Sequence, residues 1–463
     1  MAVGPAWLYS RKIPAENGTD TMTTHLTRPD FLPGYALEAV PRYTSYPPAT
    51  RFDGGVGPQT WAGWMDDQGR EPVLSLYLHI PFCRSMCWYC GCNTTVPNRD
   101  ARVARYVDAL VAEIAARPAP VDGRVHHIHF GGGSPDMLSP ERFGRIMTAL
   151  RDRFDIVPDA EIAVELDPRG VTPELCAALA AGGVTRASLG VQDLSEEVQT
   201  LIHRIQPLET VAAAAAQLRA AGIAAINMDI MYGLPAQTVE RVTATARAVA
   251  GLGADRVSVF GYAHVPWFKK HQRAIPEDRL PGAGERFEQM LAAAQTLADE
   301  GYAAIGFDHF AHPQDPLAVA AADGSLRRNF QGYTDDPYDV LIGFGASSIS
   351  ECAQGYAQNL PDPALYAEAM DRSGSAVVRG VERSPRDCTV GPQIMRLLCN
   401  FRLDGAGGDL DLDALDDMIG DGLVRVDGRN VAVTDAGKPY VRNIAARLDP
   451  DFAAGGQRHS RAV

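Results

Sequence analysis

The stretch that decides the fold of this chain is HIPFCRSMCWYC, residues 79–90. It holds Cys83, Cys87 and Cys90 on one short loop in a CxxxCxxC pattern, and Cys92 follows directly. Three thiolates can bind three irons of a [4Fe-4S] cubane and leave the fourth iron without a protein ligand, which suits a cluster that performs chemistry. The loop therefore predicts a catalytic iron–sulfur cluster whose open iron binds a small-molecule chelate.

Zinc is the alternative use of these cysteines. Four thiolates could wrap a zinc ion, but zinc sites usually combine two separated pairs, and this chain has no second CxxC pair. A disulfide framework is disfavoured, because eight cysteines in 463 residues are sparse and the other four lie scattered.

Composition excludes several classes of protein. With 46% hydrophobic and 22% charged residues, the chain is large enough for one barrel-sized domain and a smaller one. The formal net charge of −14 argues against a nucleic-acid surface, which requires clustered Lys and Arg. No apolar run approaches the roughly 18 residues that cross a membrane, and the N-terminal region lacks a signal core. We therefore expect a cytoplasmic protein, with no nucleic-acid or membrane partner.

Short apolar runs alternate with amphipathic stretches through most of the chain. This alternation predicts βα units and a parallel sheet. The expected strands are 74–80, 125–130, 161–166, 186–189, 225–231, 256–262 and 303–307. The expected helices are 101–116, 140–154, 173–181, 208–221, 238–252 and 284–300.

Residues with unusual chemistry fall near the ends of these strands. The cysteines follow the first strand, three glycines (131–133) follow the second, and Glu165 lies near the end of the third. Gln192 follows the fourth strand, and Asp229 lies in the fifth. A ring of such residues at the C-terminal mouth is how (β/α) barrels build active sites. The fold expected is α/β, a full or partial (β/α) barrel with a smaller, mainly helical C-terminal domain.

Four regions are expected along the chain. Residues 1–33 lack periodicity and predict a flexible extension, 34–72 a segment that packs on the barrel, and 73–360 the barrel itself. Residues 377–463 contain a helical stretch at 392–401 and a hairpin with Asp427-Gly428 at its turn, which predicts a winged-helix-like unit. Acidic residues outnumber basic ones there, so a lid or substrate-covering domain is favoured over DNA binding.

The glycine-rich GGGSP stretch, residues 131–135, is neither GxGxxG nor a phosphate-binding GxxxxGK[ST] loop. A plain turn is one interpretation. Beside the cysteine loop, it reads better as a platform for the ammonium or carboxylate group of a ligand.

Together these motifs carry a family resemblance. CxxxCxxC followed by GGG after the next strand resembles the radical S-adenosylmethionine (SAM) superfamily, in which the methionine moiety of SAM chelates the open iron. Further motifs follow in order, and the set resembles the oxygen-independent coproporphyrinogen III oxidase family of the haem pathway. They are RYTSYP (42–47), HIPFC, CGCN, GGGSP, VELDPRG (164–170), LGVQD (189–193), MDIMYGLP (228–235), VFGYAHVP (259–266), RRNFQGYT (327–334), ASSIS (346–350) and CNFRLD (399–404).

The resemblance implies roles for individual residues. Cys83, Cys87 and Cys90 would ligate the cluster, while Cys92 would not. Contacts to the cluster-bound SAM would come from Gly132, Gly133, Ser134, Gln192, Arg204, Asp229 and Ala263. A second SAM in the same active site would contact Tyr77, Glu165, Phe330, Gln331 and Ile349. Tyr77, Glu165 and Gln331 are also catalytic candidates, together with His309 as a possible proton donor.

The implied reaction is a radical oxidative decarboxylation. Reductive cleavage of SAM would yield a radical that abstracts hydrogen from a substrate propionate, and loss of CO₂ and an electron would leave a vinyl group. Two rounds would convert coproporphyrinogen III to protoporphyrinogen IX, with an electron donor, a terminal electron acceptor and a monomeric enzyme. The tetracarboxylate substrate needs cations, and the candidates are Arg42, Arg327, Arg328 and Arg461, although each alone could equally be a solvated surface residue.

Other interpretations remain. His127 and His129 share a strand face, which could indicate a metal pair, but hydrogen-bonded strand histidines are commoner. A related haem-binding, chaperone-like protein without oxidase activity is the main alternative function; Cys92 and the RYTSYP segment favour the oxidase. A cluster-bearing regulatory protein would not need the second SAM site.

Overall fold

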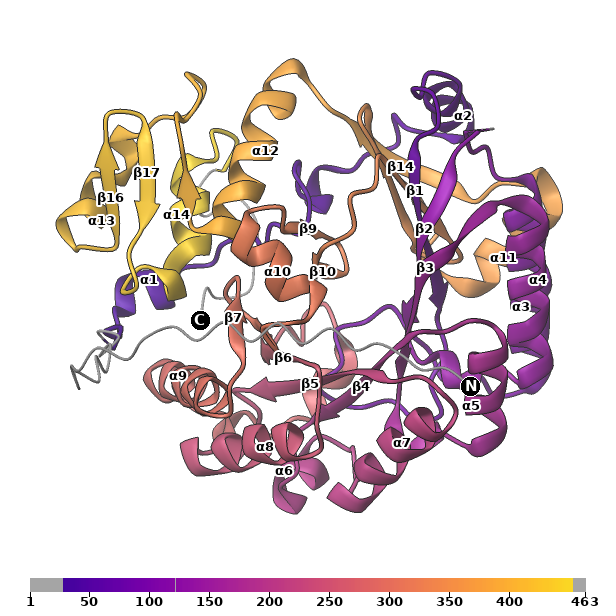
Figure 1. The fold of residues 1–463 in the computed structure, drawn as a ribbon, viewed down its shortest axis with the longest axis horizontal. Helices are drawn as coiled ribbons and strands as arrows, with labels where there is room; N and C mark the ends of the chain where they lie inside the picture. Colours follow the sequence, from indigo (N-terminus) through magenta and orange to yellow (C-terminus); the bar gives the residue numbers. More distant parts are fainter. Residues whose placement is uncertain (1–27, 121, 453–463) are drawn as a thin grey trace, which may run out of the picture.

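A twelve-stranded sheet carries the fold in the computed structural model, which describes residues 28–120 and 122–452 (Figure 1). The strand order is β14-β13-β12-β11-β1-β2-β3-β4-β5-β6-β8-β7. These strands are β1 Val73–Ile80, β2 Arg124–Gly132, β3 Asp155–Leu166, β4 Arg186–Gln192, β5 Ala225–Tyr232, β6 Arg256–Gly261, β7 Ala303–Ile305, β8 His309–Ala311, β11 Val340–Phe344, β12 Ile349–Cys352, β13 Gly355–Asn359 and β14 Val377–Glu382. Strands β1 to β6 are parallel neighbours, as the alternation of the sequence predicts.

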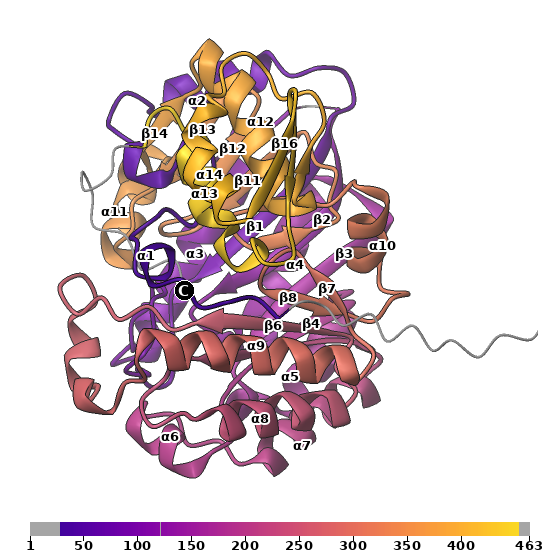
Figure 2. The same cartoon turned by 90° about the vertical axis from the view of Figure 1, so that its left-hand side faces the viewer.

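Helices cover the outer side of the parallel strands (Figures 1 and 2). They are α3 Asp100–Ala116, α4 Pro140–Arg153, α5 Pro173–Ala181, α6 Glu196–Leu201, α7 Leu208–Ala220, α8 Val239–Gly251 and α9 Ala283–Asp299. Three of them begin at a hydroxyl that accepts a backbone N–H, at Ser139, Thr172 and Thr238. All six expected helices are present, with bounds that differ by a few residues.

The sequence of β1, VLSLYLHI, shows how one strand serves two layers. Side chains alternate between the faces of a strand, so Leu74, Leu76 and Leu78 share one face and are completely buried in the main hydrophobic core with residues of α3. Ser75 lies on the opposite face and lines the internal cavity. The sheet is therefore apolar toward the helices and polar toward its concave side.

The sheet stays open, so the barrel is partial. Within the described residues, β7 pairs on one side only, and the outer side of β14 carries only an isolated bridge to Asp53. Beyond β1 the sheet continues with β11, which is parallel to β1, and then with the antiparallel strands β12 to β14. Beyond β6 it continues with the antiparallel strands β8 and β7. The sequence analysis did not predict β11 to β14, and it assigned residues 377–382, which form β14, to the C-terminal domain.

The segment before the barrel divides between two cores. Helix α1 (Pro33–Ala36), Tyr43 and Tyr46 pack with the C-terminal domain, whereas helix α2 (Pro58–Asp66) packs on the main core through Trp61 and Trp64. The Tyr43 and Tyr46 hydroxyls donate to Asp449 at 2.9 and 2.8 Å, which explains this docking. The sequence analysis expected the whole segment to pack on the barrel.

Residues 28–33 make defined contacts, although the sequence predicts a flexible extension over 1–33. The Leu32 N–H donates to the Tyr440 hydroxyl at 2.8 Å, and Phe31 packs against Phe287. Residues 1–27 lie outside the described part.

The C-terminal domain combines helices with a small sheet, as Figure 1 shows in yellow. Its elements are α12 Pro385–Asn400, β15 Arg402–Leu403, α13 Asp416–Gly420, β16 Val424–Asp427, β17 Asn430–Val433 and α14 Val441–Leu448. The helix expected at 392–401 begins earlier, because Ser384 and Asp387 form a capping box and Pro392 is tolerated inside α12. In the hairpin, Asp427 pairs with Asn430, so the turn residues are Gly428 and Arg429, and Gly428 supplies the positive φ.

The elements α10 Pro316–Asp323, β9 Arg327–Asn329 and β10 Gly332–Thr334 lie between the sheet and this domain (Figure 1). Helix α11 Pro363–Ser373 instead packs against α3. No helix in the described residues has the length and apolar character needed to cross a membrane.

Candidate active site

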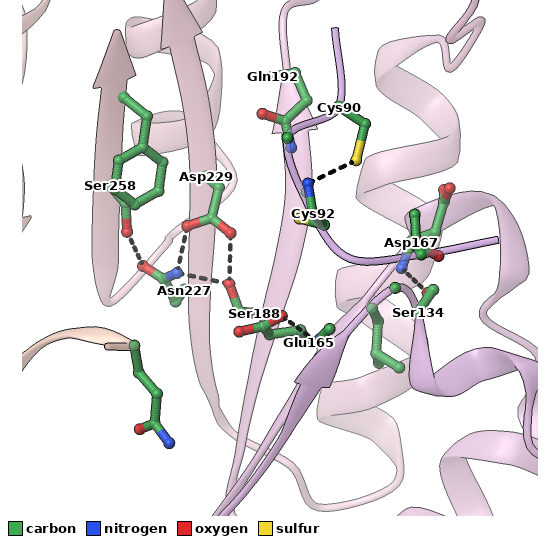
Figure 3. A pocket seen from close by; sticks show the side chains of 18 of the residues that line it. Cys90, Cys92, Ser134, Glu165, Asp167, Ser188, Gln192, Asn227, Asp229 and Ser258 are labelled. Atoms are coloured by element: carbon green, nitrogen blue, oxygen red, sulfur yellow. Dashed lines mark hydrogen bonds between the residues drawn. The ribbon is translucent and has the colours of Figure 1, made fainter. Parts of the chain in front are cut away.

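A cavity of about 690 Å³ occupies the concave side of the sheet. Residues from each of the strands β1 to β6 line it, and so do residues of the cysteine loop that follows β1. Figure 3 shows Glu165, Ser188 and Asp229 directed into this space, with Cys90 and Cys92 beside it. The sequence-predicted residues Cys83, Cys87, Cys90, Gly132, Gly133, Ser134, Glu165, Gln192, Arg204, Asp229, Ala263, His309 and Gln331 all line it.

Hydrogen bonds hold the cysteine loop in place. The backbone of Cys83 donates to Thr95 at 3.0 Å, and the Trp88 indole stacks on His203. The loop after β6 reaches over it: Lys269 donates to the Cys92 carbonyl at 2.8 Å, and the His271 ring nitrogen lies 2.7 Å from the Cys90 carbonyl oxygen. These contacts fix the loop backbone before any ligand binds.

The three thiols differ in environment. Burial raises the pKa of Cys83 to about 12, although the Thr94 hydroxyl at 3.1 Å opposes this. A hydrogen bond from the Cys92 side chain is the main cause that lowers the pKa of Cys90 to about 6. Cys87 lies 3.4 Å from the Arg204 guanidinium. All eight cysteines of the chain are free.

The arrangement fits a cluster better than a zinc ion. Among the described residues, no group of three or more His, Cys, Asp or Glu side chains is gathered closely enough to hold one metal ion. A cubane is wider than an ion, so its thiolate ligands stand further apart. Cys83, Cys87 and Cys90 line one cavity from one loop, as a cubane with an open iron requires.

The three glycines after β2 are required by close packing with protein atoms. A Cβ on Gly131 would lie 2.9 Å from the Glu165 carboxylate, and one on Gly133 would lie 2.4 Å from the Thr94 hydroxyl. Gly132 adopts φ +111°, and a Cβ there would meet the His79 ring. The GGG stretch therefore lets the cysteine loop and β3 approach the cavity wall closely.

A buried arginine lies beside the cysteine loop. Arg204 donates to Asp167 at 3.1 Å and to the Gly190 carbonyl at 2.6 Å. Its Nε is buried without a hydrogen-bond partner among the described residues. Burial alone would lower the pKa of Arg204, but Tyr89, Asp167 and Cys87 raise it, so the group stays charged. An unpaired donor on a charged group suits a carboxylate ligand.

Gln192 lies next to this arginine in a strained backbone conformation. Its φ is +66°, which a residue with a side chain rarely adopts. Its amide group would be 2.8 Å from a Cβ on Gly190, so the glycine makes room for it. Such strain clusters at functional sites.

Two carboxylates face the middle of the cavity. Glu165 lies 2.9 Å from His129 Nε2 and accepts the Gly132 N–H. Burial would raise the pKa of Glu165, but His129 and the Gly132 N–H outweigh it and hold the pKa below its usual range. Asp229 behaves differently: burial and the neighbouring Glu165 raise its pKa. The pKa values of the two carboxylates are therefore shifted in opposite directions.

Sequence reasoning missed the polar groups that hold Asp229. The Ser188 hydroxyl and the Asn227 amide each donate to it at 2.9 Å, and Ser258 contacts Asn227 (Figure 3). Asn227 and Asp229 are two residues apart on β5, and β5 pairs with β4 and β6. Polar residues at alternate positions of a strand are the signal that could have found them.

Only some of the residues expected around a second SAM line the cavity. Gln331 and Glu165 line the cavity, whereas Tyr77, Phe330 and Ile349 do not. The Tyr77 hydroxyl lies 3.0 Å from His79, and its ring stacks on His129. Phe330 packs against Phe52 and Tyr356.

The two strand histidines contact different carboxylates. His129 contacts Glu165, and His127 lies 3.9 Å from Asp336, so they do not form a shared metal pair. His309 lines the cavity and lies 2.6 Å from Asp308.

The arginine candidates for substrate binding also differ in position and exposure. Arg42 lines the cavity, and Arg328 is half-buried nearby. Arg327 is exposed and donates to the Tyr338 carbonyl at 2.9 Å. Arg461 lies outside the described residues.

Comparisons with known proteins agree with this site. Residues 77–249 match the radical SAM superfamily. Oxygen-independent coproporphyrinogen III oxidase of Bradyrhizobium diazoefficiens is 45% identical over 94% of this chain and 100% of its own length, and that of Escherichia coli is 40% identical over 88% of this chain and 92% of its own. The solved structure of coproporphyrinogen III oxidase from Escherichia coli, described as a radical SAM enzyme, superposes with a TM-score of 0.85 and 39% identity, covering 88% of this chain and 97% of that one. The chain therefore belongs to the oxygen-independent coproporphyrinogen III oxidase family of radical SAM enzymes, which use a [4Fe-4S] cluster and SAM.

Proposed function

We propose that this protein converts coproporphyrinogen III to protoporphyrinogen IX by oxidative decarboxylation of two propionates, without oxygen. The observation that carries this proposal is one cavity lined both by the three cysteines of a single loop and by Arg204, Glu165 and Asp229. The haem-binding alternative shares the cysteine loop, and Cys92 and the RYTSYP segment favour the oxidase over it. Membership in the oxidase family supports the substrate.

Cys83, Cys87 and Cys90 would hold the cluster. Gly132, Gly133, Ser134, Gln192, Arg204, Asp229 and Ala263 would contact the cluster-bound SAM. When bound, the cluster and SAM supply a reductive cleavage that produces a carbon-centred radical able to take a hydrogen atom. The unpaired Nε of Arg204 would donate to the methionine carboxylate, and the Asp229 carboxyl group would accept ribose hydroxyls.

A second SAM would lie on the β1 side of the cavity. Glu165 and Gln331, which line the cavity, would contact it directly. The family resemblance adds contacts from Tyr77, Phe330 and Ile349, which stand outside the cavity lining, and Tyr77, Glu165 and Gln331 would also act in catalysis. Support comes from the packing: Tyr77 stacks on His129, which contacts Glu165. The buried Gln331 Nε2 has no hydrogen-bond partner among the described residues and could donate to a ligand.

The chain would orient a propionate and exclude water. Loss of one hydrogen atom from the β carbon, one electron and CO₂ leaves the vinyl group, so the electron must pass to a terminal acceptor. His309, 2.6 Å from Asp308, would donate a proton at the cavity wall. We further propose an external one-electron donor, a cytoplasmic location and a monomeric enzyme.

Anaerobic turnover with coproporphyrinogen III tests the proposal. The reconstituted protein should release protoporphyrinogen IX with about two 5′-deoxyadenosines per product molecule. Cys87→Ser, assayed in parallel, should release neither. Tight haem binding without turnover would instead support the chaperone-like alternative.

A further inference from the structure

Three arginines near the cavity, of which Arg42 lines it, are not explained by the cofactor contacts. Arg42 comes from the N-terminal segment, Arg328 from β9, and Arg442 from α14 of the C-terminal domain. Helix α12 packs against both β9 and α14 (Figure 1). The three parts of the chain therefore meet at these guanidinium groups.

The three positive charges lie close enough to destabilise one another. Burial, and then Arg42 and Arg328, lower the pKa of Arg442 to about 9. Arg42 is exposed where it lines the cavity, but the protein atoms around it still desolvate the guanidinium and lower its pKa, and Arg328 adds to this. Like charges gathered in a partly desolvated place are unfavourable unless an anion accompanies them.

Asp308 is a carboxylate beside Arg42 and Arg328. His309, at 2.6 Å, and then Arg328 and Arg42 lower the pKa of Asp308 against the effect of burial. Because Asp308 also binds His309, its one negative charge leaves Arg42 and Arg328 with an excess of positive charge among the described residues.

Hydrogen-bond donors also remain available. Nε and Nη1 of Arg328 are buried and have no partner among the described residues, although its guanidinium packs on the Phe307 and Tyr333 rings at 4.8 and 4.6 Å. Arg42 lines the cavity and makes no hydrogen bond or ion pair within the described part of the chain. Arg442 differs, because it donates to the Val40 and Pro41 carbonyls at 2.9 and 3.2 Å and so positions Arg42.

We propose that Arg42, Arg328 and Arg442 form a carboxylate-binding subsite that holds one propionate of the substrate at the junction of the barrel and the C-terminal domain. This inference rests on the proposed function for the identity of the substrate. Arg42 and Arg328 contact the carboxylate, and Arg442 is a positioning residue. The cavity that Arg42 lines is continuous with the cysteine loop, so one propionate is anchored here while another reaches the reacting end.

Binding of coproporphyrin III, the fluorescent oxidised tetracarboxylate, tests the subsite on the full chain without turnover. Arg328→Met and Arg42→Met should each raise the dissociation constant at least tenfold, because each removes charge-assisted hydrogen bonds. Arg328→Lys keeps the charge and should show a smaller loss. Arg425→Met, which changes an exposed arginine on β16, is the matched control. Arg442 is left intact because it holds backbone carbonyls.

The tetramethyl ester of coproporphyrin III separates recognition from structural support. Its binding should be weak and equal in wild type and variants, because it carries no carboxylates. If Arg328→Met weakens ester and acid equally, Arg328 only supports the shape of the cavity, and the proposal fails. It also fails if binding of the acid is unchanged in both methionine variants. It fails as well if Arg327→Met weakens binding of the acid and Arg328→Met does not.

Anaerobic kinetics distinguish this inference from the proposed function. Arg328→Met should raise the KM for coproporphyrinogen III at least tenfold with kcat within about threefold, while SAM cleavage without substrate stays unchanged. If the wild type turns over and the arginine variants keep the wild-type affinity and KM, the subsite proposal fails and the proposed function stands. Arginine-dependent binding without wild-type turnover supports the subsite and overturns the proposed function.

Discussion

Replacing Arg117 with methionine is expected to cost about 3–5 kcal/mol of stability, because it leaves a buried carboxylate without its counterion. Arg117 follows α3, and its side chain is 2% exposed. It donates to Glu113 at 2.9 Å, to Asn359 at 2.9 Å and to Ser350 at 2.7 Å. Burial lowers the pKa of Arg117, and Glu113 opposes that shift, so each charge depends on the other.

The variant would leave Glu113 with neutral donors only. These are the Gly345 N–H, the Tyr366 hydroxyl and the Asn359 amide, each at 2.7 Å. Neutral hydrogen bonds do not replace a full opposite charge in the interior. Adding Glu113→Gln should therefore recover part of the loss, because the uncompensated charge disappears.

Urea denaturation followed by tryptophan fluorescence measures the effect, since the Arg117 guanidinium lies 5.2 Å from the Trp61 ring. The control is Arg145→Met. Arg145 pairs with Asp108 at 2.8 Å, but the two side chains are 52% and 62% exposed, so its loss should cost less than about 1 kcal/mol. Equal losses in the two variants, or no recovery in the double variant, would refute the reasoning. The variant also affects the region of the candidate site, because Ser350, which accepts a hydrogen bond from Arg117, adjoins Ile349 and anchors β12 beside β11.

Cys87→Ser should abolish cluster incorporation, whereas Cys92→Ser should retain about four irons per chain on anaerobic reconstitution; iron analysis that ranks them otherwise contradicts the ligand assignment. Burial raises the pKa of Asp193 to about 6. The stability contributed by the proton on Asp193 is therefore fully present below about pH 3.8 and is lost as the pH rises through 6. Asp193→Asn should therefore gain about 1 kcal/mol relative to wild type between pH 5 and pH 7 in urea titrations, and parallel curves would exclude this. Asp449→Ala should lower stability by about 2–4 kcal/mol in thermal unfolding, because it strands the buried Tyr43 and Tyr46 hydroxyls; an unchanged melting temperature would show that Asp449 does not hold the N-terminal segment.

The parallel half of the fold could be predicted from sequence because its signals are local. In β1, three leucines alternate with Ser75 and Tyr77, and three later strands precede a helix with a hydroxyl cap, at Ser139, Thr172 and Thr238. Strands β11 to β14 carry no comparable signal. They are short, and β11 finds its partner β1 more than 250 residues away, as in the pairing of Tyr77 with Gly343. Pairing at such separation is decided by the assembled core and not by the local sequence.

The residues of the candidate site also differ in how far the sequence predicts them. The cysteine loop and Glu165 were predictable, because they fall where parallel strands end. The roles expected for Tyr77, Phe330 and Ile349 came from the family resemblance alone. Arg442 could not be predicted from its own surroundings in the sequence, because its place beside Arg42 depends on docking of the C-terminal domain.

The open barrel and its polar interior are connected. A closed barrel of eight parallel strands fills its interior with layers of apolar side chains. Here the parallel strands, β11 and β1 to β6, leave the concave side open, and it carries ion pairs instead: Arg186 lies 3.2 Å from Glu161, and Arg256 lies 2.7 Å from Asp315. All but Asp315 of these four line the cavity. Charges at this depth are tolerated when each is paired and the space beside them is accessible to water or ligand. The incomplete barrel therefore leaves a cavity beside the sheet, and the paired charges on its wall are incompatible with filling that space by apolar side chains.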